Sequence, residues 1–166
     1  AREVVAARPG FAAAQYMLGS LYLSKGSLPQ AVEALSAAAR LAPNNGVTHL
    51  TLASGYERAG NVDKALAAYK RTQALLPNDP RPYNNAAWLY AVQGKNLDEA
   101  LALARKAHDL TRDTPAMAPG LAGVLDTLGF VHYRRGEYAE AEPLFRRAAE
   151  LATNNVTVQY HLGLIY

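Results

Sequence analysis

The sequence repeats itself with a period of 34 residues. Residues 16–45 read YMLGSLYLSKGSLPQAVEALSAAARLAPNN, and residues 50–79 read LTLASGYERAGNVDKALAAYKRTQALLPND. Most small, aromatic and apolar positions of the two stretches coincide, and the pattern continues to the end of the chain. A period of this length indicates a repeat architecture, in which each repeat is one supersecondary unit that buries its apolar face against its neighbours.

Composition and turn residues indicate that each repeat is a pair of helices. Half of the residues are hydrophobic, alanine supplies much of that share, and only 8% are aromatic, which favours helix. Small residues recur where two antiparallel helices would have to approach closely, and glycines recur where the first helix would end. The small positions are Gly19, Ala53, Ala87 and Gly129 in the first helices and Ala31, Ala65, Ala100 and Ala141 in the second. The helix-ending glycines are Gly26, Gly60, Gly94 and Gly136. The Pro-Asn-Asn and Pro-Asn-Asp stretches are expected to end the second helices and to cap the helices that follow.

This pattern resembles the tetratricopeptide repeat, a helix–turn–helix unit of 34 residues. The resemblance implies an all-α fold, a right-handed α-solenoid of antiparallel helix pairs. We expect a single segment over 1–166, with the tail of a preceding repeat at 1–11 and the first helix of a further repeat at 156–166. The four full repeats would be 12–45, 46–79, 80–114 and 122–155. Ala104 and Thr153 depart from the pattern, standing where a large residue and a proline are usual.

An insertion at 115–121 interrupts the register between the third and fourth repeats. The stretch TRDTPAMAPGLAG (111–123) contains Pro115, Pro119 and Gly120, which do not fit one straight helix. Insertions in repeat proteins usually loop out from one face. The segment is therefore either a tolerated surface loop or extended helix start, or a part of a binding surface that also alters the superhelical bend.

The resemblance implies a concave groove lined by the first helix of each repeat. In the family, repeat positions 5, 6 and 9 are among those that face this groove, whereas neighbouring positions pack inward. Trp88 and Phe130 both fall at position 9, and His161 also falls on this surface. The alternative for both rings is a structural role, wedged against the next first helix. The expected groove residues are Tyr16, Arg81, Asn84, Asn85, Trp88, Asp126, Phe130, Tyr133, Arg134 and Tyr160.

Within the groove we expect aromatic anchors and hydrogen-bonding groups for a peptide. Tyr16, Trp88, Phe130 and Tyr133 would bury apolar surface, and Arg81, Asn84, Asn85 and Arg134 would bond a peptide backbone or carboxylates. The five-residue clamp with which some members of the family hold the carboxylate of a chaperone tail is not present. From the first repeat only Arg81 keeps a required charge, and one repeat later only Asn85 fits.

The sequence lacks the patterns of an enzyme or of a cofactor site. It contains no phosphate loop, nucleophile elbow or dinucleotide glycine motif, so we expect no catalytic activity and no cofactor. The chain has no cysteine, and its four histidines are too scattered for a local metal motif. We expect His132 and His49 to be packed. The net charge of +3 is too small to indicate nucleic acid, and no apolar run is long enough to insert into a membrane.

We therefore expect a protein-interaction scaffold that binds a peptide or partner-protein segment in the groove. Stretches such as NNAAWLY and LDTLGFVHYRRGEYAEA are similar to those of bacterial tetratricopeptide proteins, including scaffolds linked to exopolysaccharide secretion and exosortase systems. The alternative is therefore contact with a polysaccharide or its secretion machinery, and self-association through the terminal repeats is a further possibility. Since the chain begins at Ala1, we expect its targeting segment to be missing, which leaves bacterial cytoplasm and periplasm open.

Overall fold

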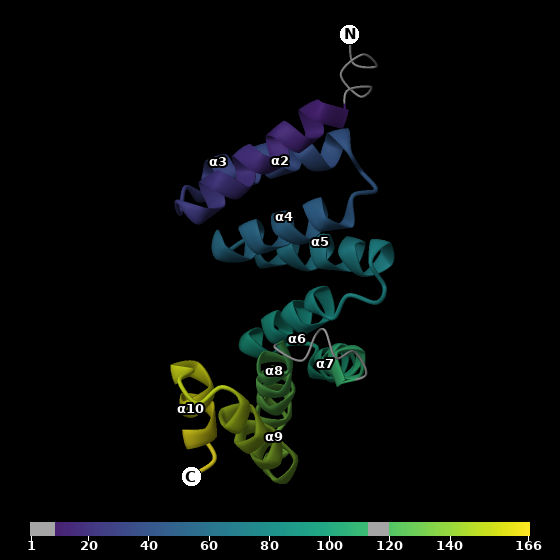
Figure 1. Ribbon diagram of the computed structural model, residues 1–166. Helices are drawn as coiled ribbons and strands as arrows, with labels where there is room; N and C mark the ends of the chain where they lie inside the picture. The colour runs from purple at the N-terminus through teal and green to yellow at the C-terminus, as the bar shows by residue number, and fades with distance from the viewer. Residues whose placement is uncertain (1–8, 113–119) are drawn as a thin grey trace. The chain divides into compact units, whose positions relative to one another are not determined.

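The computed structural model describes residues 9–112 and 120–166, and these residues form helices without any strand (Figure 1). The all-α prediction is confirmed. The chain divides into two compact units, residues 1–77 and 78–166. The helices are α2 (Pro9–Ser24), α3 (Leu28–Leu41), α4 (Gly46–Arg58), α5 (Val62–Leu75), α6 (Arg81–Gln93), α7 (Leu97–Arg112), α8 (Leu121–Arg134), α9 (Tyr138–Leu151) and α10 (Val156–Gly163).

The first unit consists of two helix pairs, α2 with α3 and α4 with α5, and α3 also packs on α4 (Figure 1). Its core holds Leu35, Ala39 and Leu52, with Tyr16 and Tyr56 among the half-buried residues packed against it. Helix α2 begins at Pro9, three residues before the predicted repeat 12–45. Proline suits this place because the first turn of a helix does not need its backbone N–H.

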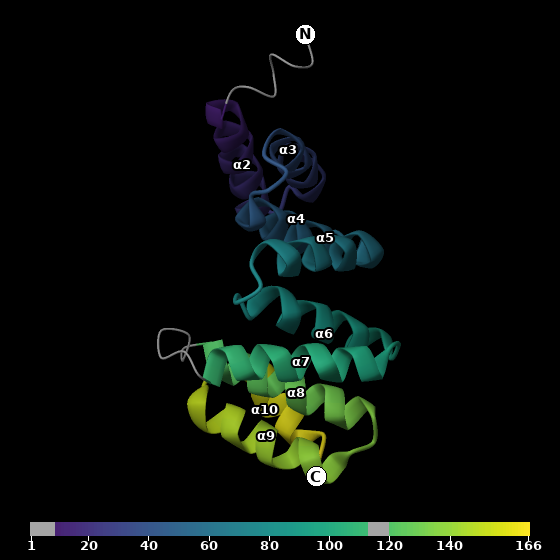
Figure 2. The same ribbon diagram turned by 90° about the vertical axis from the view of Figure 1, so that its right-hand side faces the viewer.

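The second unit stacks the pairs α6–α7 and α8–α9 and adds α10 (Figure 2). One core cluster joins Ala87, Ala91, Ala100, Ala104, Leu128 and Val131. A second cluster joins Leu125, Ala148, Ala149 and Val158, and so anchors α10 to α8 and α9. Ala104, which departs from the repeat pattern by being small, is fully buried.

The small positions of the repeat are confirmed as places of close helix approach. A Cβ on Gly19 would lie 2.6 Å from Cγ of Leu35, and one on Gly129 would lie 2.8 Å from Cδ1 of Phe145. Ala53 and Ala87 are fully buried at the equivalent place of the first helices. Larger side chains there would push the paired helices apart, since protein cores are close-packed.

Helix ends follow the turn chemistry that the sequence predicts. Gly26, Gly60, Gly94 and Gly136 all have positive φ, between 65° and 78°. Oδ1 of Asn45 accepts a hydrogen bond from N of Thr48, and Oδ1 of Asn155 accepts from N of Thr157 and Val158. The N-cap predicted for the Pro-Asn-Asn stretch is thereby confirmed, whereas the helix after Pro-Asn-Asp has Pro80 at its N-cap and no side-chain cap bond. The predicted insertion at 115–121 lies, up to residue 119, outside the described residues.

Candidate functional site

A hollow of about 310 Å³ lies on the second unit, where α8 packs against both α6 and α10. The first helices of successive repeats thus supply its walls. Four predicted groove residues line it, namely Asn84, Asn85, Trp88 and Asp126. The other lining residues are Gly123, Thr127, Asn155, Thr157 and Val158.

Trp88 lies beside other rings as well as on the wall of the hollow. Its centroid is 4.9 Å from that of Phe130, with the planes tilted by 39°, and 5.8 Å from that of His161. Phe130 and His161 stack on each other, with centroids 4.9 Å apart. The indole is half-buried. Trp88 therefore combines the two roles left open by the sequence, because part of its ring packs on neighbours while the residue still lines the hollow.

His161, one of these rings, also forms a buried polar pair with Asp126, which links α10 to α8. Nδ1 of His161 lies 2.9 Å from each carboxylate oxygen of Asp126. Only 4% of His161 and 7% of Asp126 is exposed. Both residues were expected on the groove surface. Both are largely buried, although Asp126 still lines the hollow, and each satisfies the other's hydrogen bond away from water.

The two arginines expected in the groove have partners within the chain. The guanidinium of Arg81 donates to both carboxylate oxygens of Asp79, and Nη2 lies 2.6 Å from Oδ2. Nη1 of Arg134 donates to the backbone oxygen of Val92, at the end of α6, and its guanidinium lies over the ring of Phe130. Arg58 makes the equivalent bond in the first unit, to the backbone oxygen of Leu23. Both Arg134 and Arg58 therefore help to satisfy the carbonyls at helix ends.

The carboxyl group of Asp79, just before α6, has a pKa that is shifted in part by its arginine partner. Partial burial acts to raise this pKa, but side-chain and backbone hydrogen bonds from Arg81, together with its positive charge, outweigh burial. The pKa of Asp79 consequently lies below its usual value. Oδ1 of Asp79 also accepts from the backbone N of Arg81, the first residue of α6, and so satisfies one of the N–H groups left open at the start of that helix.

The remaining predicted groove residues lie outside the hollow. Tyr133 stacks on Phe130, with centroids 6.2 Å apart, and Tyr160 is 63% exposed beside His161. Tyr16 belongs to the first unit, where its hydroxyl lies 3.4 Å from Oγ1 of Thr51. The predicted groove residues that line the hollow therefore all belong to the second unit.

Four residues of the hollow, Gly123, Asn155, Thr157 and Val158, were not expected as groove residues from the sequence. Gly123 and Thr157 share one place in the repeat, two residues into their predicted units, so the register could have found them. Neither Asn155 nor Val158 falls at a groove-facing position of the register. Thr127, the fifth of these additional lining residues, falls at position 6 of its repeat, which is one of the groove-facing positions.

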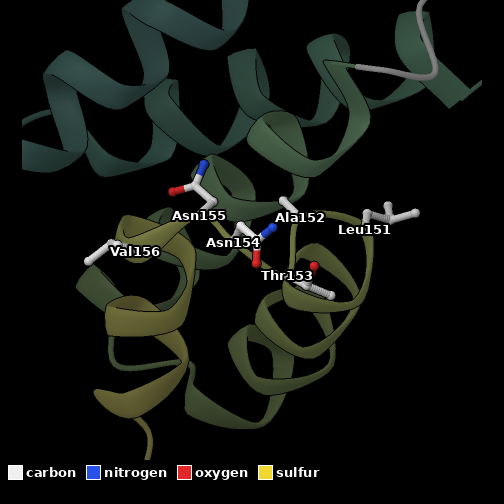
Figure 3. A pocket seen from close by; sticks show the side chains of 6 residues that line it. All are labelled: Leu151, Ala152, Thr153, Asn154, Asn155 and Val156. Atoms are coloured by element: carbon white, nitrogen blue, oxygen red, sulfur yellow. The ribbon is translucent and has the colours of Figure 1, made fainter.

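A second hollow, of about 610 Å³, lies at the turn between α9 and α10 (Figure 3). Six consecutive residues, 151–156, line it, and the side chains of Leu151 and Val156 point away from the turn in opposite directions. This hollow has neither an aromatic wall nor a charged group. The first hollow is therefore the stronger candidate for a binding site.

Within the described residues there is no group of three His, Asp or Glu side chains that could hold a metal ion. The helices of the same residues are also too short or too polar for any of them to cross a membrane.

Comparison with known proteins identifies the repeat. Two family models described as tetratricopeptide repeat match residues 23–89 and 79–154. The chain is 34% identical over 134 residues to cellulose synthase 2 operon protein C of Komagataeibacter xylinus, covering 77% of this chain but 10% of that protein. It therefore spans about a tenth of the length of that relative.

Solved structures share the fold at lower identity. Pseudomonas aeruginosa PilF is similar with a TM-score of 0.78 and 22% identity, covering 94% of this chain and 68% of that one. The TPR2B domain of yeast Sti1, in a complex with pHsp70, gives a TM-score of 0.69 and 18% identity, covering 75% and 98%. Fold, repeat pattern and family models agree. The chain belongs to the tetratricopeptide repeat family.

Proposed function

We propose that the second unit binds an extended segment of a partner protein at the hollow lined by Asn84, Asn85 and Trp88. Tetratricopeptide repeat proteins are generally non-catalytic scaffolds for protein–protein interaction. The observation that carries the proposal is the convergence of an indole, several amides and hydroxyl groups in one concave place. Such a combination of apolar wall and oriented polar groups is typical of a recognition site.

The energetic contribution of the hollow would come mainly from Trp88. Covering the exposed part of this indole removes at most about 90 Å² of surface from water, which corresponds to at most about 2 kcal/mol. The aromatic contacts with Phe130 and His161 hold the indole in place before a ligand arrives, which lowers the entropy cost of binding.

A blocking substitution tests this function without disturbing the core. Thr157 lines the hollow and is exposed, so Thr157→Arg should fill the hollow and leave the helices intact. Thr153→Arg adds the same charge at an exposed threonine that lines only the second hollow. Partners captured from a bacterial lysate would be identified, and their binding segments would be titrated as peptides. We expect Thr157→Arg to weaken binding at least tenfold and Thr153→Arg to leave it unchanged. Equal binding by both variants would refute the proposal.

A second candidate function is contact with a polysaccharide in a secretion assembly. The similarity to a cellulose synthase operon protein favours it, and the indole of Trp88 is the kind of surface on which sugar rings stack. Titration with cello-oligosaccharides, followed by the fluorescence of Trp88, tests this candidate. A saturable change that Thr157→Arg abolishes would support it, and the absence of any change would exclude it.

A further inference from the structure

In each unit, the first helix of one repeat is joined to the first helix of the next repeat by a pair of polar side chains at the same two repeat positions. In the first unit the hydroxyl of Tyr16 meets Oγ1 of Thr51, and in the second unit Asp126 meets His161. Both pairs are separated by 35 residues and join the fifth position of one predicted repeat to the sixth of the next. Asn84 on α6 and Thr127 on α8 hold these two positions at the hollow.

Asn84 and Thr127 occupy the equivalent positions but do not hydrogen-bond to each other. Oδ1 of Asn84 is buried and, among the described residues, has no hydrogen-bond partner. Nδ2 of Asn84 donates to Oδ1 of Asn85, at 3.3 Å. The hydroxyl of Thr127 donates to the backbone oxygen of Gly123, at 3.0 Å, and keeps lone pairs that can accept. Both side chains line the hollow, so they offer acceptors to a ligand that brings its own donors.

The charges around the hollow select against an ionised ligand. Among the lining residues that the structure describes there is no lysine or arginine, and the one ionisable side chain, Asp126, is a carboxylate already bonded by His161. A carboxylate ligand would meet no positive partner there. An ammonium ligand would lose its water and find only a carboxylate that is already engaged. An uncharged group with two N–H donors matches the open acceptors without that cost.

We propose that the hollow binds the side-chain carboxamide of a glutamine or asparagine in the partner segment. The ligand's NH₂ group donates to Oδ1 of Asn84 and to Oγ1 of Thr127. Oδ1 of Asn84 reaches the ligand by rotation about χ2, a broad torsion in asparagine. Trp88 covers the aliphatic stem of the ligand's side chain. This inference rests on the proposed function, because it names the residue that the bound segment inserts.

Four peptides of one Gly/Ser sequence, differing only at a central Gln, Glu, Met or Lys, provide the probe. Glu and Met have nearly the shape of Gln but lack the amide donors, and Lys supplies donors with a charge. Binding to the 166-residue chain is followed by NMR, through the side-chain amide signals of Asn84 and the indole signal of Trp88. We expect the Gln peptide to bind about fivefold tighter than each of the others, as expected for hydrogen bonds that the others cannot make.

Asn84→Leu is the test variant and Gln93→Leu is its control. Asn84→Leu keeps the branching and the number of heavy atoms of the side chain and removes the unpartnered oxygen, so we expect Gln and Met peptides to bind it within about twofold of each other. Gln93 is exposed at the end of the same helix, and Gln93→Leu should keep the preference for Gln. If Asn84→Leu fails to fold, the comparison of the four peptides on the unsubstituted chain still decides the question.

The possible outcomes separate this inference from the proposed function. Equal or tighter binding of the Glu, Met or Lys peptide overturns the inference while leaving peptide binding at the hollow intact. Retention of the Gln preference by Asn84→Leu overturns the assigned acceptor. If no peptide shifts the signals of Asn84 or Trp88, whereas a cello-oligosaccharide does, both the inference and the peptide-binding proposal fail.

Discussion

The imidazole of His161 donates through Nδ1 to the carboxylate of Asp126, 2.9 Å from each oxygen, across the interface between α10 and α8. Four aromatic rings, those of Trp88, Phe130, Phe145 and Tyr160, have centroids within 5.8 Å of the imidazole. The pair is therefore enclosed by apolar groups, where a polar side chain without a partner is costly.

Removal of one partner of this pair should destabilise the second unit more than removal of both. We expect Asp126→Leu or His161→Leu alone to lower the free energy of unfolding by about 3 kcal/mol, because each leaves a buried polar group unsatisfied. The double variant should lose less than either single variant, because no polar side chain of the pair is then left without its partner. Urea unfolding followed by the fluorescence of Trp88 reports on this unit, since Trp88 is the chain's one tryptophan. Additive single effects would show that the pair contributes no coupling energy.

Gly129 should not tolerate a side chain. A Cβ at this position would lie 2.8 Å from Cδ1 of Phe145 and 3.3 Å from Cβ of Leu144, so α8 and α9 would have to separate. We expect Gly129→Ala to lower the stability of the second unit by about 1–3 kcal/mol. Gly123→Ala on the same helix is the control, because nothing lies within 4 Å of a Cβ there, and it should be neutral or stabilising. The prediction fails if both variants unfold at the same urea concentration.

Gly136 should be needed for its backbone conformation and not for space. Its φ is +78°, and a Cβ there would meet no atom within 4 Å. Gly136→Ala should therefore cost about 1–2 kcal/mol, the penalty of an L-residue in the left-handed region. Gly136→Asn should cost less, because asparagine visits this region more readily. Thermal unfolding by circular dichroism would compare the two, and equal stability of the alanine variant and the unsubstituted chain would contradict the argument.

The features that recur in every repeat were predictable from the sequence. The contacts that occur at only one interface between repeats were not. Gly136 and Gly129 recur at fixed spacing, so their conformations and contacts follow from the helix-pair geometry that the period implies. Asp126 and His161 lie in different repeats and have no periodic counterpart of the same type. Placement on a shared face could be expected for each, but burial as a pair depends on how closely α8 and α10 pack.

The hydrogen-bond partners of the two groove-facing arginines could not be predicted from the sequence either. Arg81 and Arg134 occupy groove-facing places in the register, yet each is bonded within the chain. The partner of Arg81, Asp79, lies two residues earlier and was expected only to cap α6. The partner of Arg134 is a backbone oxygen, which no side-chain pattern can reveal. Register predicts the direction in which a side chain leaves the helix, whereas the competition among its possible partners is settled only by the packed structure.

Ionisation of Asp79 should stabilise the second unit in a pH-dependent manner. Because the pKa of Asp79 is lowered in the folded chain, the stabilisation by its carboxylate is fully present above the ordinary aspartate pKa of about 4. It is lost as the pH falls through the lower pKa of the folded state. Asp79→Asn keeps an acceptor for the backbone N of Arg81 but removes the charge. We expect the unsubstituted chain to be more stable than Asp79→Asn at pH 6, and the difference to shrink steadily below about pH 4.

Urea unfolding followed by Trp88 fluorescence between pH 6 and pH 2.5 would measure this difference. Glu140→Gln removes one negative charge at an exposed position of the same unit and controls for net charge. Its stability difference from the unsubstituted chain should stay small across the whole range, since a solvated surface charge contributes little. A difference for Asp79→Asn that is independent of pH, or that grows on acidification, would mean that hydrogen bonding to Arg81 does not depend on the charge of Asp79.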